Sequence, residues 1–166
     1  MRACLAQANQ AYKESQLDRA FELYSQAINM LLQITGAMNE EVARCITNIA
    51  SIQFKFGDFL QAIELQTKAI VLQERLLGVE HPDVGYSYAT LSMYYHNCGY
   101  FSKGFEYLHR SLSILQSAIG EYHPELASIY LKLGLVYQEV DNLDAALEAY
   151  TQHLDQTRNM FGEDHI

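Results

Sequence analysis

The stretch Leu76-Leu77-Gly78-Val79-Glu80-His81-Pro82-Asp83 decides the fold, because it recurs along the chain at a fixed interval. Its glycine is one of four, Gly36, Gly78, Gly120 and Gly162, that are each 42 residues apart. The surrounding residues repeat as well, in the forms ITG-AMNEE, AIG-EYHPE and MFG-EDHI. A constant interval over a chain of 166 residues predicts a repeat architecture, which needs no single globular core.

One repeat reads as two helices joined by a tight turn. Residues 41–56 and 59–77 each place apolar side chains at helical spacing, and Gly57-Asp58 separates them. Asp58 suits the N-cap of the second helix, and Gly78 suits a C-terminal stop in a left-handed conformation. Pro82 opens the next helix, where its missing N–H costs no hydrogen bond.

Other positions keep the same interval and extend this unit to the whole chain. The turn position holds Ser15, Gly57, Gly99 and Asp141; small residues recur at Ala20, Ala62, Gly104 and Ala146 and at Ala8, Ala50, Ser92 and Gly134; large ones recur at Leu17, Phe59, Phe101 and Leu143. We therefore predict an all-α fold with helices at 2–14, 17–34, 40–56, 59–77, 82–97, 101–119, 124–139 and 143–161. They should form one solenoid over residues 1–166, with repeats at 1–36, 37–78, 79–120 and 121–162 and the start of a fifth at 163–166.

Small and large residues at fixed offsets within a helix pair resemble the tetratricopeptide pattern, an α–α superhelix. The unit here exceeds the usual length of about 34 residues, and the added residues fall at the end of the second helix and in the link after it. The resemblance implies antiparallel helix pairs that stack into a right-handed arc. It also implies that the first helix of each pair lines the concave face.

Two narrower families share features with this chain. The link Leu77-Gly78-Val79-Glu80-His81-Pro82-Asp83 is similar to the repeats of kinesin light chains. A second set of motifs resembles the repeat region of the clustered-mitochondria family. The set consists of Phe56-Gly57-Asp58-Phe59, the run from Glu74 to Pro82, Tyr94-Tyr95 and Phe161-Gly162-Glu163-Asp164-His165. That resemblance implies a cytoplasmic scaffold concerned with mitochondrial distribution and with messenger RNA for mitochondrial proteins. A cargo adaptor like kinesin light chain stays open as the alternative.

The family comparison also predicts that this chain is the repeat portion of a larger protein, with neither end formed by a polar capping helix. The uncapped last helix should then expose Leu147, Tyr150 and Leu154. Such a surface favours end-to-end self-association.

Positions on the inward side of the first helices differ from repeat to repeat, unlike the core positions. They form four rows: Arg2, Arg44, Tyr86 and Ser128; Ala6, Asn48, Thr90 and Lys132; Asn9, Ser51, Met93 and Leu135; and Lys13, Lys55, Asn97 and Glu139. Variation within a periodic frame is typical of a recognition surface, although a solvated face looks the same. From these rows we predict a concave peptide-binding site of Arg44, Asn48, Ser51, Lys55, Tyr86, Thr90, Met93, Asn97, Ser128 and Lys132. Arg, Lys and Asn suit carboxylates and peptide groups.

Aromatic residues and histidines offer two further readings. The third repeat holds Tyr86, Tyr88, Tyr94, Tyr95, Tyr100, Phe101, Phe105 and Tyr107, which suit either a stacking platform or the core. We assign all but Tyr86 to the core.

His81, His123 and His165 recur every 42 residues, too far apart to share a metal ion, so we expect them to hydrogen-bond the link between repeats. No metal or cofactor is predicted.

Charge and motifs argue against several function classes. The net charge is −9, and residues 121–162 hold seven acids against two bases. RNA binding by phosphate neutralisation favours a basic surface, so it stays an alternative that the charge opposes. No phosphate loop, nucleophile elbow or zinc-protease motif is present, and we predict no enzyme activity. No apolar run is long enough to insert in a membrane. Cys4, Cys45 and Cys98 fit small core residues rather than a disulfide framework.

Overall fold

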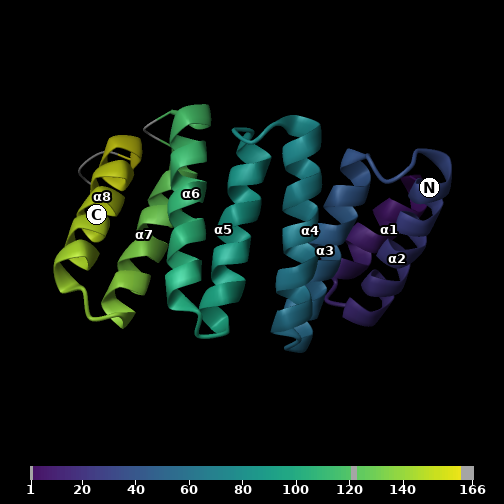
Figure 1. Ribbon diagram of the computed structural model, residues 1–166, viewed down its shortest axis with the longest axis horizontal. Coiled ribbons are helices and arrows are strands. Elements are labelled where there is room, and N and C mark those ends of the chain that lie inside the picture. The colour runs from purple at the N-terminus through teal and green to yellow at the C-terminus, as the bar shows by residue number, and fades with distance from the viewer. Residues whose placement is uncertain (1, 121–122, 162–166) are drawn as a thin grey trace. The chain divides into compact units, whose positions relative to one another are not determined.

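A computed structural model describes residues 2–120 and 123–161, which form helices and no strand (Figure 1). The helices are α1 (Arg2–Lys13), α2 (Leu17–Ile34), α3 (Glu40–Phe56), α4 (Phe59–Leu77), α5 (Pro82–Asn97), α6 (Phe101–Ile119), α7 (Pro124–Glu139) and α8 (Leu143–Phe161). The all-α prediction is confirmed, and the predicted bounds hold at every helix except the first. That helix ends at Lys13 rather than at residue 14, because the chain turns away before Ser15.

The chain divides into two compact units, residues 1–79 and 80–166. Unit 1 holds α1 to α4 and unit 2 holds α5 to α8, so each unit contains two of the predicted repeats. The division falls within one residue of the predicted boundary after Gly78. Each unit is described below by itself, and the continuity of all four repeats in one solenoid stays a prediction.

The turn inside each helix pair has the same geometry in all four repeats. Ser15 and Asp141 have φ of 59°, and Gly57 and Gly99 have φ of 86° and 77°. The amide of the residue after this turn position reaches back five positions, from Gln16 to Ala11, Asp58 to Gln53, Tyr100 to Tyr95 and Asn142 to Tyr137, at 2.9–3.0 Å. These bonds are those of a Schellman turn, which satisfies carbonyls at a helix end. The turn position of the 42-residue interval therefore fixes a backbone conformation rather than a residue type.

The link between repeats ends in a side-chain cap. His81 Nδ1 accepts a hydrogen bond from the Asp83 amide at 3.2 Å, and His123 Nδ1 accepts one from Glu125 at 3.4 Å. The prediction that the periodic histidines bond the link is confirmed for these two residues, while His165 lies outside the described residues. Asn39 caps α3 in the same way, accepting from Glu41 at 2.8 Å.

One backbone torsion of Gly78, ψ, differs from the left-handed conformation predicted for it. Its φ of 93° is positive as expected, but its ψ of 154° lies outside the left-handed helical region. The chain leaves α4 in an extended direction toward the link, and glycine is the residue that adopts this region freely.

Each unit has its own core around small residues at the helix crossings. Ala20 and Ala62 in unit 1 are fully buried, as is Ala8 on α1. In unit 2 a Cβ on Gly104 would lie 3.1 Å from the Ser92 carbonyl oxygen, so α5 and α6 approach closely there. Close contact at these positions follows the prediction from their size. Cys45 is also buried, and burial raises the pKa of its thiol to about 11.

Candidate functional site

An apolar cavity of about 190 Å³ lies between α5 and α7 in unit 2. Met93 and Lys132, both predicted as binding residues, line it from the two first helices. Its other lining residues are Ala89, Ser92, His96, Leu108, Leu135 and Val136. Met93 and Leu135 are 41% and 50% exposed, so a ligand can reach the mouth of the cavity without displacing the core.

The C-terminal ends of α5 and α7 are joined beside this cavity. His96 Nε2 lies 3.0 Å from Glu139 Oε2, and the His96 ring packs edge-on against Phe101 with centroids 5.1 Å apart. This pair holds one wall of the cavity in place. The pairing also engages the carboxylate of Glu139, a residue that the sequence analysis placed on the inward side of α7.

Tyr86 marks the opposite end of the inward side of α5. Desolvation, followed by a hydrogen bond to the Glu125 carboxylate and the charge of that carboxylate, raises the pKa of Tyr86 to about 12. The hydroxyl therefore donates to Glu125 on α7. The half-buried Tyr86 ring links α5 and α7. It is therefore less available to a ligand than the sequence indicated.

The small polar residues among the predicted set bond to their own helices. Thr90 Oγ1 donates to the Tyr86 carbonyl at 3.0 Å, and Asn97 Nδ2 donates to the Met93 carbonyl at 2.8 Å. Ser128 is exposed on α7. In unit 2 the structure thus brings only Met93 and Lys132, of the six predicted residues there, to a common cavity.

The four predicted residues of unit 1 lie on α3 and make a different set of contacts. Arg44 pairs with Glu40 at 2.8 Å and Glu41 at 3.6 Å, both on its own helix. Lys55 Nζ lies 4.1 Å from the centre of the Tyr12 ring on α1. Asn48 and Ser51 are half-buried. Arg44 is therefore already paired with two carboxylates of its own helix.

The predicted set leaves out most residues of the unit 2 site, among them Leu135, His96 and Glu139. Leu135 occupies the same row as Met93, one repeat later, and that row was the available signal. His96 and Glu139 lie on two different helices, so no spacing along the chain relates them.

The aromatic residues of α5 and α6 are mostly internal, as expected, with two exceptions. Tyr88 and Tyr94 are buried, and the Tyr107 ring stacks on Tyr88 and Tyr95 with centroids 5.7 and 5.3 Å apart. Tyr100 and Phe101, assigned to the core, are 55% and 36% exposed. Tyr100 is the N-cap of α6 and Phe101 is its first residue, so both stand at a helix end, where fewer side chains cover them.

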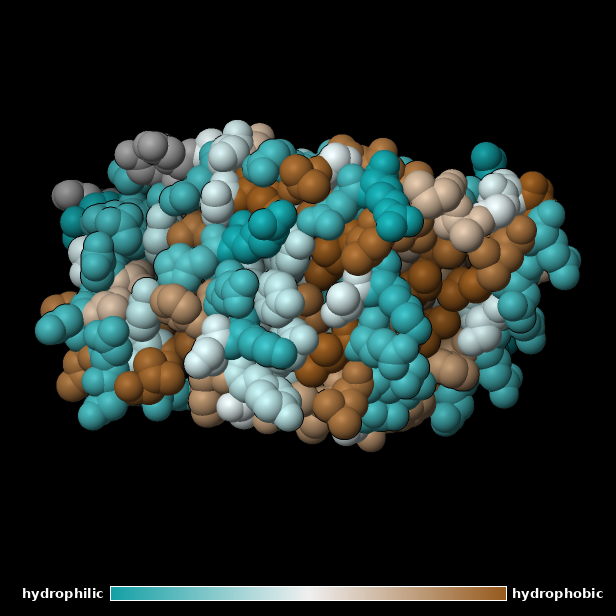
Figure 2. Space-filling model, viewed as in Figure 1, coloured by the Kyte–Doolittle hydropathy of each residue, from teal (hydrophilic) through white to brown (hydrophobic). Residues whose placement is uncertain are grey.

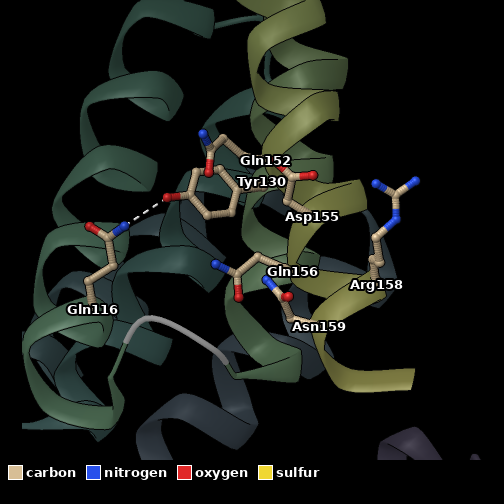
Figure 3. A pocket seen from close by; sticks show the side chains of 7 residues that line it. All are labelled: Gln116, Tyr130, Gln152, Asp155, Gln156, Arg158 and Asn159. Carbon is tan, nitrogen blue, oxygen red and sulfur yellow. Dashed lines mark hydrogen bonds between the residues drawn. The ribbon is translucent and has the colours of Figure 1, made fainter. Parts of the chain in front are cut away.

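A second cavity, of about 360 Å³, is polar and lies among α6, α7 and α8 (Figure 3). Figure 3 shows four carboxamides facing it, from Gln116, Gln152, Gln156 and Asn159, and a 2.7 Å hydrogen bond from Gln116 Nε2 to the Tyr130 hydroxyl. Gln156 is 7% exposed, and its Oε1 has no hydrogen-bond partner among the described residues. The sequence signal was a break in an apolar row, because Met30, Leu72 and Ile114 precede Gln156 at the same interval.

The described part of the chain contains neither a cluster of metal-binding side chains nor a helix that could span a membrane. Within residues 2–120 and 123–161, no three His, Cys, Asp or Glu side chains are grouped to hold an ion. Every described helix falls short of the length or apolarity that a membrane span needs.

Comparison with known proteins identifies the repeats. Family models described as tetratricopeptide repeat match residues 42–83 and 93–159, which together make up more than half of the chain. This chain is a tetratricopeptide repeat protein. No curated protein matches its sequence. The clustered-mitochondria resemblance therefore gains no support from these comparisons, and the tetratricopeptide assignment stands without it.

Solved structures share the fold of these tetratricopeptide repeats at low sequence identity. BtubC (BKLC) from P. vanneervenii superposes with a TM-score of 0.89 at 22% identity, over 96% of this chain and 63% of that one. A putative kinesin light chain from Podosopora anserina gives 0.83 at 20% identity, over 99% and 78%. A Rap protein complexed with competence and sporulation factor gives 0.79 at 15% identity, over 97% and 43%. This chain thus spans less than two thirds of BtubC and under half of the Rap protein.

Proposed function

We propose that this tetratricopeptide repeat protein is a non-enzymatic interaction scaffold, and that unit 2 binds a peptide segment on the inward side of α5 and α7. The observation that carries the proposal is the apolar cavity between Met93 and Leu135, with Lys132 at its side. The two matching positions in unit 1 hold Asn9 and Ser51, so the apolar pair is particular to unit 2.

The size of the cavity indicates what enters it. Pockets for small-molecule ligands usually measure about 300–1,000 Å³. The α5–α7 cavity, at about 190 Å³, is smaller and suits a single apolar side chain. A peptide that anchors one such side chain and lays its backbone along the two helices fits this shape, because most binding energy at interfaces comes from a few buried anchors.

The charge of unit 2 indicates the character of the peptide. Residues 80–166 contain twelve Asp and Glu residues but only four Lys and Arg residues. Lys132 is the cation beside the cavity, and the Glu139 carboxylate faces His96 nearby. A neutral or basic segment is therefore favoured over an acidic one, because the net field of the unit repels anions.

The solved relatives support a binding role without identifying the partner. The Rap protein with this fold holds competence and sporulation factor, and other matched structures are kinesin light chain proteins. At such low sequence identity, these structures indicate a shared fold and nothing more. For this chain the proposal therefore rests on the residues of the α5–α7 cavity.

A selection experiment tests the proposal. Short random peptides displayed on phage are selected against the full chain and counter-selected against Leu135→Asp, which places a charge at the cavity mouth. We expect enriched peptides to share one apolar residue and to carry no net negative charge. Their affinity should fall by about tenfold or more in Leu135→Asp and in Met93→Asp, because both changes leave the anchor facing a carboxylate.

The matched control is Leu147→Asp, the same change at an exposed leucine of α8. It should leave peptide affinity unchanged while circular dichroism shows equal helix content in all three variants. Equal enrichment against wild type and Leu135→Asp would contradict the proposal.

The narrower assignments remain predictions. A cytoplasmic role of clustered-mitochondria type, in mitochondrial distribution and messenger RNA binding, rests on the sequence resemblance alone. A cargo adaptor function is supported by the fold shared with kinesin light chain proteins. For RNA, fluorescence anisotropy with single-stranded RNA is the test, and a steep loss of affinity with salt is the result that RNA binding requires.

A further inference from the structure

The polar cavity among α6, α7 and α8 contains a buried acceptor that the described chain does not satisfy. Gln156 is 7% exposed, and its Oε1 accepts no hydrogen bond from the described residues. An unpaired buried acceptor destabilises a fold, and nearly all buried polar atoms in proteins have a partner. The Gln156 oxygen therefore calls for a donor from water or from a ligand.

The preceding repeat of unit 2 shows which group occupies the matching place there. Tyr88 and Arg110 stand one 42-residue interval before Tyr130 and Gln152, which both line the cavity. Arg110 Cζ lies 5.0 Å from the centre of the Tyr88 ring, within the range of a cation–π contact. Where the repeat supplies an arginine, this fold thus lays a guanidinium on the tyrosine of the first helix.

The residues around this place change in one chemical direction from α6 to α8. Gln152 takes the position of Arg110, so a cation is lost. Carboxylate and carboxamide oxygens are gained over the next two turns, where Ser113, Ile114 and Ser117 give way to Asp155, Gln156 and Asn159. A cavity that lacks its own guanidinium and has added acceptors suits a guanidinium from another molecule.

We propose that the polar cavity binds a guanidinium group, as an arginine side chain presents it. A guanidinium is planar, carries several N–H donors and accepts no hydrogen bond. It therefore satisfies Gln156 Oε1, and the carboxamides of Gln152 and Asn159 can turn their oxygens toward its other N–H groups. Tyr130 supplies the aromatic wall that Tyr88 supplies for Arg110.

The size and charge of the surroundings favour this ligand. The cavity volume of about 360 Å³ lies within the usual range of small-ligand pockets, about 300–1,000 Å³. Figure 2 shows mostly hydrophilic side chains on the surface over α8 and α6. The excess of acids over bases in residues 80–166 attracts a cation to this surface.

Arg158 also lines the cavity, but it is not placed to fill it. Figure 3 shows its guanidinium on the side of α8 away from Gln116. In the repeat it matches Gln116 rather than Arg110, so it belongs to a different row. Because its charge repels a bound cation, Arg158→Gln should leave the affinity for a guanidinium unchanged or higher.

This site is independent of the proposed function. Its lining residues lie between Gln116 and Asn159, and none of them lines the α5–α7 cavity. Peptide binding at the α5–α7 cavity can therefore fail while guanidinium binding holds, and the reverse is equally possible.

NMR titration with arginine derivatives tests the inference on the full chain. The probe is Nα-acetyl-arginine methylamide. Two matched derivatives serve as controls: lysine keeps the charge without the plane, and citrulline keeps the plane without the charge. We expect the arginine derivative to shift the side-chain amide signals of Gln116, Gln156 and Asn159, with an affinity at least about tenfold above either control.

Free arginine, titrated in the same way, distinguishes the sources of the group. Affinity equal to that of the derivative indicates a small guanidino compound as the ligand. Binding by the derivative alone indicates an arginine within a polypeptide, because free arginine differs only in its charged ammonium and carboxylate.

Variants assign the binding to the cavity. Gln152→Arg gives α8 the arginine that α6 has, and its guanidinium should displace the ligand and lower the affinity by about tenfold or more. The matched control is Gln26→Arg, the same change at the same repeat position on the exposed side of α2, which should leave the affinity unchanged. Gln156→Leu, which restores the leucine found at Leu72, should also abolish binding while circular dichroism shows equal helix content.

Three results would overturn the inference. One is equal affinity for the arginine and lysine derivatives, and another is binding that survives both Gln152→Arg and Gln156→Leu. The third is the absence of any shift in the carboxamide signals at every concentration that leaves the protein folded, since water alone would then be the partner of Gln156.

Discussion

The Tyr150 ring lies directly over Gly134, so that a Cβ on Gly134 would overlap Tyr150 Cε1. The two residues belong to α7 and α8, and the Tyr150 hydroxyl continues to Gln138 on α7. Glycine here makes room for the ring. This contact draws Tyr150 into unit 2, while Leu147 and Leu154 on α8 are exposed, as is Leu143.

Gly134→Ala should therefore destabilise the protein. Within a helix this change normally stabilises by up to about 1 kcal/mol. Here the overlap with the ring reverses the sign, and we expect the free energy of unfolding to fall by about 1–3 kcal/mol. Urea unfolding followed by circular dichroism measures it. Tyr150→Leu in the same background should recover part of the loss, and a Gly134→Ala protein as stable as wild type would disprove the contact.

The turn position offers a stabilising change. Ser15 and Asp141 adopt φ of 59°, where Gly57 and Gly99 stand in the other repeats. A non-glycine residue in this region costs about 1–2 kcal/mol, less for Asp. Ser15→Gly should raise the free energy of unfolding by about 0.5–1 kcal/mol after the added entropy of glycine is subtracted. Ser113→Gly, in the exposed middle of α6, is the control and should lower it. A loss of stability in both variants would refute the strain at Ser15.

The histidine caps should contribute to stability through one acceptor nitrogen each. His81→Ala leaves the Asp83 amide without its side-chain partner and should cost about 1 kcal/mol of unfolding free energy. His81→Asn restores an acceptor at the N-cap and should retain most of the stability. Denaturant titrations of the three proteins decide the point, and equal stability of the Ala variant and wild type would show that the cap contributes nothing.

Alkaline pH should unfold the protein through groups buried in unit 1. Burial raises the pKa of Tyr24 from 10.0 to about 12 and that of Cys45 from 9.0 to about 11. Both groups bind their protons more tightly when folded, so their stabilising effect is complete below pH 9 and is lost as pH rises toward 12. Urea midpoints between pH 8 and 12 should fall across this window. The decline should be shallower in Tyr24→Phe, and midpoints that stay level up to pH 12 would contradict the assignment.

The sequence predicted the helices well because the repeat interval marks their ends with glycine, proline and capping residues. Ser15, Gly57, Gly99 and Asp141 share one backbone geometry that their common position already indicated. The site was harder to predict. Arg44 faces Glu40 and Glu41 on its own helix, and His96 reaches Glu139 across two helices, so spacing alone did not show which polar groups are already paired.

Chemical-shift mapping with ¹³C-methyl methionine tests peptide binding at the α5–α7 cavity most directly. Met93 lines the cavity, whereas Met30 and Met38 lie in unit 1 and serve as internal controls. On adding a peptide selected against the full chain, we predict that the Met93 methyl signal shifts in proportion to occupancy while those of Met30 and Met38 stay in place. A peptide that saturates the protein and leaves the Met93 signal unmoved would contradict the account.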